Sequence, residues 1–148
     1  MSAEQIASQV VSDETVTITG GEPTIHKDLG HLVERLHQMN CFVTVETNGT
    51  NPVPNNFNWI TCSPKPPEYK IHPFLDPHEL KYVVTKEFNP SKHISDELRN
   101  MYNGLIWLQP DGTNFETMQD SWKRIYRMVM RDSRLRAGIQ LHKIMEVQ

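Results

Sequence analysis

The sequence predicts an α/β fold with a mainly parallel sheet, on the basis of three observations. Short β-branched stretches alternate with stretches of helical apolar spacing along the 148 residues. Most predicted strands end in Gly, Pro or Asn, which are turn residues. The composition, with 37% apolar and 22% charged residues, is that of an ordinary globular domain. Residues 1–148 are therefore predicted to form one domain.

The N-terminal part is predicted to form a helix end, a strand and a second helix. Residues 2–12 have the pattern of a helix end, and residues 15–19 are β-branched, as in a strand. Asp28 is expected to cap a helix that runs to about Asn40. Its apolar residues recur at the spacing of one helical face: Leu29, Leu32, Val33, Leu36 and Met39.

Two strands are predicted in the middle of the chain. Residues 41–47 read C-F-V-T-V-E-T and stop at Asn48-Gly49, which is a turn signal. Residues 59–62 follow a Pro-rich loop and form a short strand. The alternation therefore continues beyond the first helix.

The C-terminal half repeats this pattern. Residues 80–85 and 105–109 are predicted strands, and the helix between them starts at Ser91 or Ser95. That helix is expected to end at residue 103, with Gly104 at its C′ position.

The last predicted helix begins with Thr113 and Glu116, which are expected to form a capping box. Its apolar residues lie on one stripe: Phe115, Met118, Trp122, Ile125 and Val129. A final strand is predicted for residues 138–142.

The composition also excludes some classes of partner. The net charge of −3 is not that of a protein that coats nucleic acid, so none is expected. No apolar run reaches membrane-spanning length and the first residues lack the pattern of a signal peptide, so we expect a cytoplasmic protein. Cys41 and Cys62 are expected to be reduced and buried.

Polar, Gly or Pro residues follow nearly every predicted strand. Parallel sheets bind their ligands at the carboxyl ends of the strands, so these residues form the candidate site. In chain order they are Gly20-Gly21-Glu22-Pro23, residues 46–50, Ser63-Pro64-Lys65, Gln109-Pro110-Asp111-Gly112, and His142 with Lys143.

The residues that follow a predicted strand are called its exit, and the exits of the first strands have both functional and structural interpretations. Gly20 and Gly21 have no Cβ, so a ligand can approach their backbone closely. Glu22 suits an ammonium group, or is a solvated carboxylate near a helix start. Ser63 with Lys65 is a carboxylate clamp or an ordinary surface loop.

The exits of two later strands also have two interpretations each. Gln109 precedes a proline and points its amide at an adenine edge or at nothing. His142 is a catalyst or an ordinary histidine at a strand end. The coincidence of these exits is stronger evidence for a ligand site than any one of them.

The order of the motifs resembles a known family. G-G-E-P at 20–23 after a strand, with E-T-N-G-T at 46–50, resembles the radical S-adenosylmethionine (SAM) enzymes. The later motifs are similar to those of the 7-carboxy-7-deazaguanine synthase family: Ser-Pro-Lys at 63–65, Leu-Lys-Tyr-Val-Val at 80–84, Leu-Gln-Pro at 108–110 and Leu-His-Lys at 141–143. The resemblance covers residues 4–148 and implies a partial (β/α) barrel of the radical SAM type.

The resemblance implies a role for each candidate residue. Gly21 would hold the methionine ammonium of SAM, with Gly20 and Glu22 beside it. The rest of the SAM site would come from two later exits: Ser63, Pro64, Lys65, Gln109, Pro110, Asp111 and Gly112. The pterin substrate would contact Thr19, His142 and the C-terminal Gln148, although relatives often end in proline.

The reaction implied by the resemblance is that of a lyase in queuosine and 7-deazapurine biosynthesis. It converts 6-carboxy-5,6,7,8-tetrahydropterin into 7-carboxy-7-deazaguanine and ammonia. The full-length family uses SAM, a four-iron–four-sulfur cluster and magnesium. The substrate-side partner is therefore a small pterin molecule.

The sequence departs from the family at the cluster. The family binds three irons through a cysteine triplet that precedes the G-G-E-P motif, whereas none of the 19 residues before Gly20 is cysteine. The resemblance also implies that the family's first strand, cluster loop and magnesium position are missing from this sequence. We therefore expect an N-terminally truncated radical SAM domain that is inactive alone.

Two alternatives remain open. The chain is a cluster-less SAM-binding or regulatory module, or a fragment of another organic-radical-activating enzyme. In each case the missing first strand leaves a sheet edge unpaired, so we expect a homodimer. A basic run near the last helix, comprising Lys123, Arg124, Arg127, Arg131, Arg134 and Arg136, is interpreted as a solvated helix face rather than a nucleic-acid surface.

Overall fold

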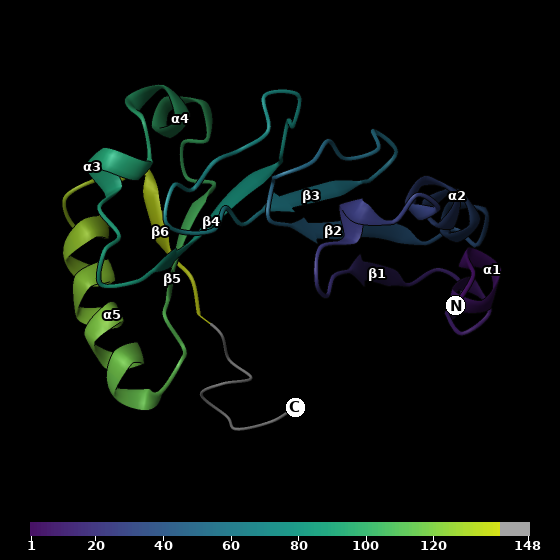
Figure 1. Cartoon of the computed structure of the whole chain (residues 1–148), viewed down its shortest axis with the longest axis horizontal. Helices are drawn as coiled ribbons and strands as arrows, with labels where there is room; N and C mark the ends of the chain where they lie inside the picture. The colour runs from purple at the N-terminus through teal and green to yellow at the C-terminus, as the bar shows by residue number, and fades with distance from the viewer. Residues whose placement is uncertain (140–148) are drawn as a thin grey trace. The chain divides into compact units, whose positions relative to one another are not determined.

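Strand pairing within this chain is parallel, as the alternation of strands and helices predicts. The computed structural model describes residues 1–139 and shows helices interleaved with short strands (Figure 1). The chain divides into two units. Unit 1 comprises Met1–Pro64 and Lys70–His78, and unit 2 comprises Lys65–Tyr69 and the chain from Glu79 onward.

Unit 1 is built on a three-stranded parallel sheet in the order β1-β2-β3. Thr15 of β1 lies opposite Phe42 of β2, and Thr47 at the end of β2 lies opposite Cys62 of β3. The helix α1 packs against α2 (Figure 1). The elements of this unit are α1 (Ala3–Ala7), β1 (Thr15–Ile18), the 3-10 helix η1 (Pro23–Ile25), α2 (Leu29–Gln38), β2 (Phe42–Thr47) and β3 (Trp59–Cys62).

Unit 2 has the same plan, with β5 between β4 and β6. All pairings are parallel, and Val84 at the end of β4 lies opposite Pro110 at the end of β5. The long helix α5 packs on β5 and β6 (Figure 1). The elements of this unit are β4 (Glu79–Val84), α3 (Pro90–His93), α4 (Asp96–Met101), β5 (Ile106–Pro110), α5 (Phe115–Val129) and β6 (Leu135–Ala137).

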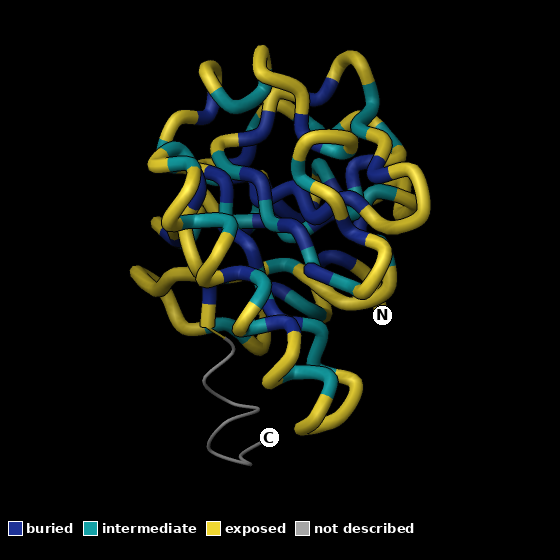
Figure 2. Tube along the Cα trace, turned by 90° about the vertical axis from the view of Figure 1, so that its left-hand side faces the viewer, coloured by how far each residue is buried: buried dark blue, intermediate teal, exposed yellow. Residues whose placement is uncertain are grey.

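Buried residues occur in both the helices and the strands of each unit (Figure 2). In unit 1 the core includes Val33, Leu36, Val43, Val45 and Ile60. In unit 2 it includes Leu80, Tyr82, Ile106, Leu108 and Ile125. The predicted apolar face of α2 is confirmed, because Leu29, Leu32, Val33 and Leu36 are all buried.

Burial alternates strictly along β2, β4 and β5, so only one face of each strand is fully buried. Successive side chains of a strand point to opposite faces. The half-buried face of β4 and β5 therefore carries Glu79, Lys81, Trp107 and Gln109. This face offers polar groups to a ligand while the other face maintains the core.

Two predicted helix caps are wrong. Asp28 precedes α2, but its backbone is not extended (φ −89°, ψ 9°) and its side chain makes no capping hydrogen bond. The capping box of Thr113 and Glu116 does not form. Asn114 caps α5 instead, because its extended backbone directs the side-chain oxygen to the backbone N–H of Thr117 at 2.8 Å. The hydroxyl of Thr113 donates to Asp111.

Three element boundaries also differ from the prediction. The first helix ends at Ala7 rather than residue 12. The helix predicted between β4 and β5 is two helices, because Ile94 adopts an extended backbone (φ −128°) and buries its side chain. The last strand is residues 135–137, earlier than the predicted 138–142, and residues 140–142 lie outside the described part of the chain.

The predicted apolar stripe of α5 is only partly buried. Ile125 is fully buried, but Phe115 at the start of the helix is 69% exposed. Cys41 and Cys62 are buried and neither forms a disulfide, as the sequence predicts. Within residues 1–139, no helix has both the length and the apolar character needed to cross a membrane.

The turn between α5 and β6 is held by Asp132, which contradicts the expectation that the basic run is only a solvated face. Its carboxylate accepts hydrogen bonds from Arg134 Nε at 2.9 Å and Arg99 Nη1 at 3.2 Å. Hydrogen bonds from Arg134 outweigh the effect of burial and, with the nearby charge of Arg99, lower the pKa of Asp132 to about 2.

Core packing in unit 2 gives a first prediction. Leu108 is fully buried whereas Leu105, which precedes β5, is 39% exposed. We expect Leu108→Ala to lower the free energy of unfolding by about 2–5 kcal/mol, because it removes buried methyl groups and leaves a cavity. The matched control Leu105→Ala should lose less than about 1 kcal/mol. Urea denaturation followed by tryptophan fluorescence measures both, and equal losses would contradict the assigned core.

Acid denaturation gives a second prediction. The pKa of Asp132 is lowered in the folded state, so its contribution to stability is present above the unfolded pKa of roughly 4. That contribution is lost as the pH falls from about 4 toward 2. We expect Asp132→Asn to be less stable than the native protein at pH 6, with the difference narrowing over this window. A difference independent of pH, measured by urea denaturation at each pH, would refute the assigned ion pair.

Candidate functional site

The carboxyl ends of β1, β2 and β3 lie on one edge of the unit 1 sheet, because the three strands are parallel. Ser63, directly after β3, is buried, and its backbone N–H donates to the carbonyl of Thr47 at 2.7 Å. Pro64 follows it and is also buried. The predicted exits of these three strands are therefore brought together.

Gly20 and Gly21 follow β1 and have φ angles of 91° and 48°, which residues with a side chain rarely adopt. A Cβ built on either glycine would have no atom within 4 Å. The left-handed backbone at these two positions, rather than crowding, is what requires glycine. Thr19 and Gly20 line a hollow of about 380 Å³. A ligand group can therefore reach this stretch of backbone.

Glu22 joins the ends of β1 and β2. Its Oε1 accepts hydrogen bonds from the Thr47 hydroxyl at 2.6 Å and from the hydroxyl and backbone N–H of Thr24 at 2.7 and 3.2 Å. Its Oε2 accepts from the backbone N–H of Asn48 at 2.7 Å. Four protein donors thus fix this carboxylate in the turn.

These contacts set the charge state of Glu22. Burial raises its pKa, but the hydrogen bonds from Thr24, Thr47 and Asn48 together outweigh burial, so the pKa of Glu22 is below its ordinary value. The side chain is therefore an anion at neutral pH. The sequence placed Thr47 and Asn48 at a strand exit but did not identify them as partners of Glu22.

Gly49 is the most constrained residue of the β2 exit. Its φ is 78°, and a Cβ there would lie 2.5 Å from Cys62 Sγ. Its neighbour Asn48 accepts hydrogen bonds through Oδ1 from the hydroxyl and backbone N–H of Thr50. The Asn-Gly turn is therefore required by the close approach of β3.

The remaining candidate residues belong to unit 2. Gln109 and Pro110 form the end of β5, and Gln109 lies on its half-buried face. It lines a hollow of about 340 Å³ with Lys81 and Trp107, whose indole N–H donates to Glu79 at 2.9 Å. The face therefore supplies polar groups next to Gln109.

The loop after β5 is a tight polar turn. Asp111 accepts hydrogen bonds from the hydroxyl and the backbone N–H of Thr113 at 2.6 and 3.2 Å, across Gly112. Lys65 is exposed, and its carbonyl accepts from the backbone N–H of Tyr69. His142 and Gln148 lie outside the described residues.

The predicted site residues thus form two groups. Unit 1 contains Thr19, Gly20, Gly21, Glu22, Ser63 and Pro64, and unit 2 contains Lys65, Gln109, Pro110, Asp111 and Gly112. Within residues 1–139, no three His, Cys, Asp or Glu side chains gather as a metal site. Cys41 and Cys62 are buried, and the Cys41 thiol contacts the carbonyl of Val11. The two cysteines therefore belong to no group of three such side chains among the described residues.

Parallel strands that alternate with helices define this chain as an α/β protein. No protein-family model matches the sequence. Proteins called 7-carboxy-7-deazaguanine synthase are similar to it. The one from Bradyrhizobium diazoefficiens is 30% identical over 99% of this chain and 67% of its own length. The one from Nitratidesulfovibrio vulgaris is 46% identical over 89% of this chain and 58% of its own length. The one from Bacteroides thetaiotaomicron is 29% identical over 100% of this chain and 74% of its own length.

The chain therefore belongs to the 7-carboxy-7-deazaguanine synthase family. This chain matches these relatives along most of its length, but it spans only 58% to 74% of the length of each relative. The resemblance identified from the G-G-E-P motif and the later motifs is thereby confirmed.

The contacts of Glu22 give a third prediction. We expect Glu22→Gln to lower the free energy of unfolding by about 1–3 kcal/mol, because an amide nitrogen cannot accept the hydrogen bonds that one carboxylate oxygen accepts. Glu14 is exposed, and Glu14→Gln should change stability by less than about 0.5 kcal/mol.

The pH dependence of the stability difference between Glu22→Gln and the native protein supplies a further control. The folded pKa of Glu22 is lowered, so its stabilisation is present above the ordinary glutamate pKa and is lost as the pH falls through the folded pKa. Urea denaturation at neutral and acidic pH should show the Glu22→Gln effect shrinking in acid. The same loss for both variants at neutral pH would contradict the four-donor arrangement.

Proposed function

We propose that this chain provides the SAM- and pterin-binding portion of a radical SAM enzyme. The enzyme is a lyase that converts 6-carboxy-5,6,7,8-tetrahydropterin into 7-carboxy-7-deazaguanine and ammonia, for queuosine and 7-deazapurine biosynthesis. The observation that carries the proposal is a Gly-Gly-Glu strand exit with an open backbone, in a chain of the 7-carboxy-7-deazaguanine synthase family.

The methionine end of SAM is assigned to the β1 exit. Gly20 and Gly21 are exposed, and apart from their chain neighbours no atom lies within 4 Å of a Cβ built on either glycine, so their backbone carbonyls are assigned as acceptors for the ammonium. Glu22 Oε1 is occupied by three donors, whereas Oε2 accepts only from Asn48 among the hydrogen bonds of the described residues. Glu22 therefore positions the turn and adds negative charge beside the ammonium.

The other predicted site residues are assigned to the remaining parts of SAM and to the pterin. Ser63, Pro64 and Lys65 are assigned to the carboxylate side of SAM, and residues 109–112 to its adenosine end. Thr19, His142 and Gln148 are assigned to the pterin. SAM supplies the radical in enzymes of this class, and the protein groups bind and orient the reactants.

The iron–sulfur cluster is assigned no ligands in this chain. The sequence has two cysteines, both buried in unit 1, and the described residues contain no group of three His, Cys, Asp or Glu side chains that could hold a metal. This observation favours a second candidate function, a SAM-binding module without its own cluster. The two candidates share SAM binding and differ in cluster formation.

A SAM-binding experiment gives the fourth prediction. We expect SAM to bind the full chain in isothermal titration calorimetry. Gly20→Ala should weaken the affinity about tenfold or more, because a side chain strains the left-handed turn that presents the ammonium site. Gly104→Ala is the matched control, since Gly104 also has a left-handed backbone (φ 79°) but lies outside the site. No SAM binding by the native chain would overturn the proposal.

Cluster formation separates the two candidates. Anaerobic reconstitution with iron and sulfide should give no stoichiometric cluster on this chain and no 5′-deoxyadenosine from SAM, because the cysteine triplet is absent from the sequence. Stoichiometric cluster together with 5′-deoxyadenosine would refute the cluster-less assignment and leave the SAM site intact.

A further inference from the structure

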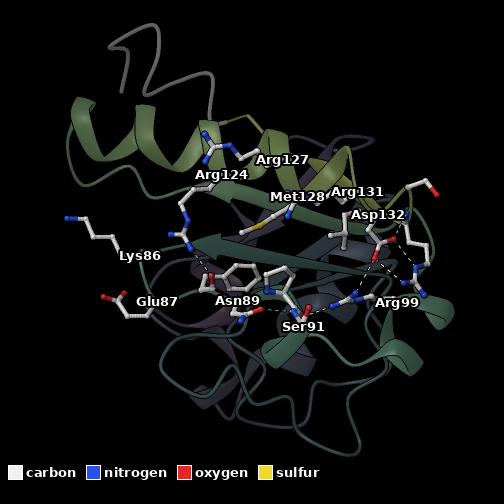
Figure 3. Close-up of a pocket in the computed structure, with 15 residues that line it drawn as sticks. Lys86, Glu87, Asn89, Ser91, Arg99, Arg124, Arg127, Met128, Arg131 and Asp132 are labelled. Atoms are coloured by element: carbon white, nitrogen blue, oxygen red, sulfur yellow. Dashed lines mark hydrogen bonds and ion pairs between the residues drawn. The ribbon is translucent and has the colours of Figure 1, made fainter.

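A large groove in unit 2 is not used by the proposed function. It has a volume of about 870 Å³ and lies between α5 and residues 86–91, which follow β4 (Figure 3). A second hollow of about 270 Å³ shares Lys86, Arg124 and Arg127 with it. We call the two together the α5 groove. None of the predicted SAM- or pterin-binding residues lines it.

The α5 groove is strongly basic. The lining of its larger part contains six cationic side chains and only two carboxylates, Glu87 and Asp132. The six cations are Lys86, Arg99, Arg124, Arg127, Arg131 and Arg134. The whole chain has a net charge of −3, so this concentration of positive charge is local. Such a surface attracts anions.

Three of the six arginine and lysine side chains build the walls of the groove. Arg99 and Arg134 neutralise Asp132, and Arg99 also donates to the carbonyl of Pro90 at 2.6 Å. Arg124 crosses from α5 to donate to the carbonyl of Phe88 at 2.7 Å (Figure 3), and it also donates to the carbonyl of Thr85. The Arg124 contacts hold Thr85 and Phe88 against α5, and Arg99 of α4 links Pro90 to Asp132, so these protein contacts shape the groove.

The other three cations are exposed and have no ion pair or side-chain hydrogen bond within residues 1–139: Lys86, Arg127 and Arg131. Arg124, Arg127 and Arg131 are spaced three and four residues apart, so they lie on one face of α5 or its end. Like charges at this spacing repel each other. A bound anion would remove this repulsion and use groups that the fold leaves unpaired.

We propose that the α5 groove binds a compact polyphosphate anion, either free or as the phosphate chain of a nucleotide. Arg guanidinium groups bind phosphate oxygens in a bidentate manner, and a polyphosphate carries enough charge to engage all three unpaired cations. Ser91 adds a hydroxyl to the lining.

Nucleic acid is the less favoured occupant. Single-stranded nucleic acid is commonly held by aromatic side chains on which its bases stack. The single aromatic residue in the lining of the larger part is Phe88, which is only 2% exposed. The groove therefore offers charge for phosphate but no stacking surface for bases.

The test uses the full chain and tripolyphosphate as the probe, in isothermal titration calorimetry at low and at about 0.15 M ionic strength. The site variant is the double substitution Arg127→Gln with Arg131→Gln. The control is Lys92→Gln with Arg136→Gln, which removes the same charge from exposed residues of unit 2 outside the groove lining. Thermal unfolding of both variants checks that they remain folded.

Tripolyphosphate is expected to bind with one-to-one stoichiometry. The site variant should weaken binding by about tenfold or more, while the control stays within about twofold of the native affinity. Parallel titrations with ATP and with a single-stranded RNA identify the source of the phosphates. No saturable tripolyphosphate binding, equal weakening by both variants, or binding of the RNA alone would overturn the proposal. SAM binding to the same variants should be unchanged, so the two assignments fail independently.

Discussion

The bonds between neighbouring strand ends are the interactions on which the candidate site in unit 1 depends. Parallel pairing places the ends of β1, β2 and β3 on one edge, and two contacts then lock that edge. Glu22 joins the β1 exit to Thr47 and Asn48, and the Ser63 N–H joins the β3 exit to Thr47. The left-handed glycines at 20 and 21 are presented by this framework rather than by their own packing.

In unit 2, arginine guanidinium groups hold the segments that follow β4 and precede β6. Arg124 holds the chain that leaves β4, and Arg99 and Arg134 hold Asp132 at the turn into β6. These arginines serve the fold, while their neighbours Arg127 and Arg131 are left exposed. A basic run that looks uniform in the sequence is therefore two groups with different physical roles.

Residue patterns were sufficient where the cause is local. The apolar spacing from Leu29 to Leu36 predicted the buried face of α2, and the turn at Asn48-Gly49 predicted the end of β2. The cap at Asn114 was missed because Thr113 and Glu116 also fit a capping pattern, and only the backbone angle decides between them. The break at Ile94 was missed because it depends on burial of that side chain against distant residues.

The sequence by itself determined the α/β class, the strand exits and the family, because these follow from periodicity and from the order of short motifs. Tertiary structure alone decided that Glu22 binds four donors, that Gly49 must be glycine beside Cys62, and that Asp132 joins two arginines. The reason is physical: hydrogen bonding and close contact link residues far apart in the chain, and periodicity within one segment carries no information about such partners.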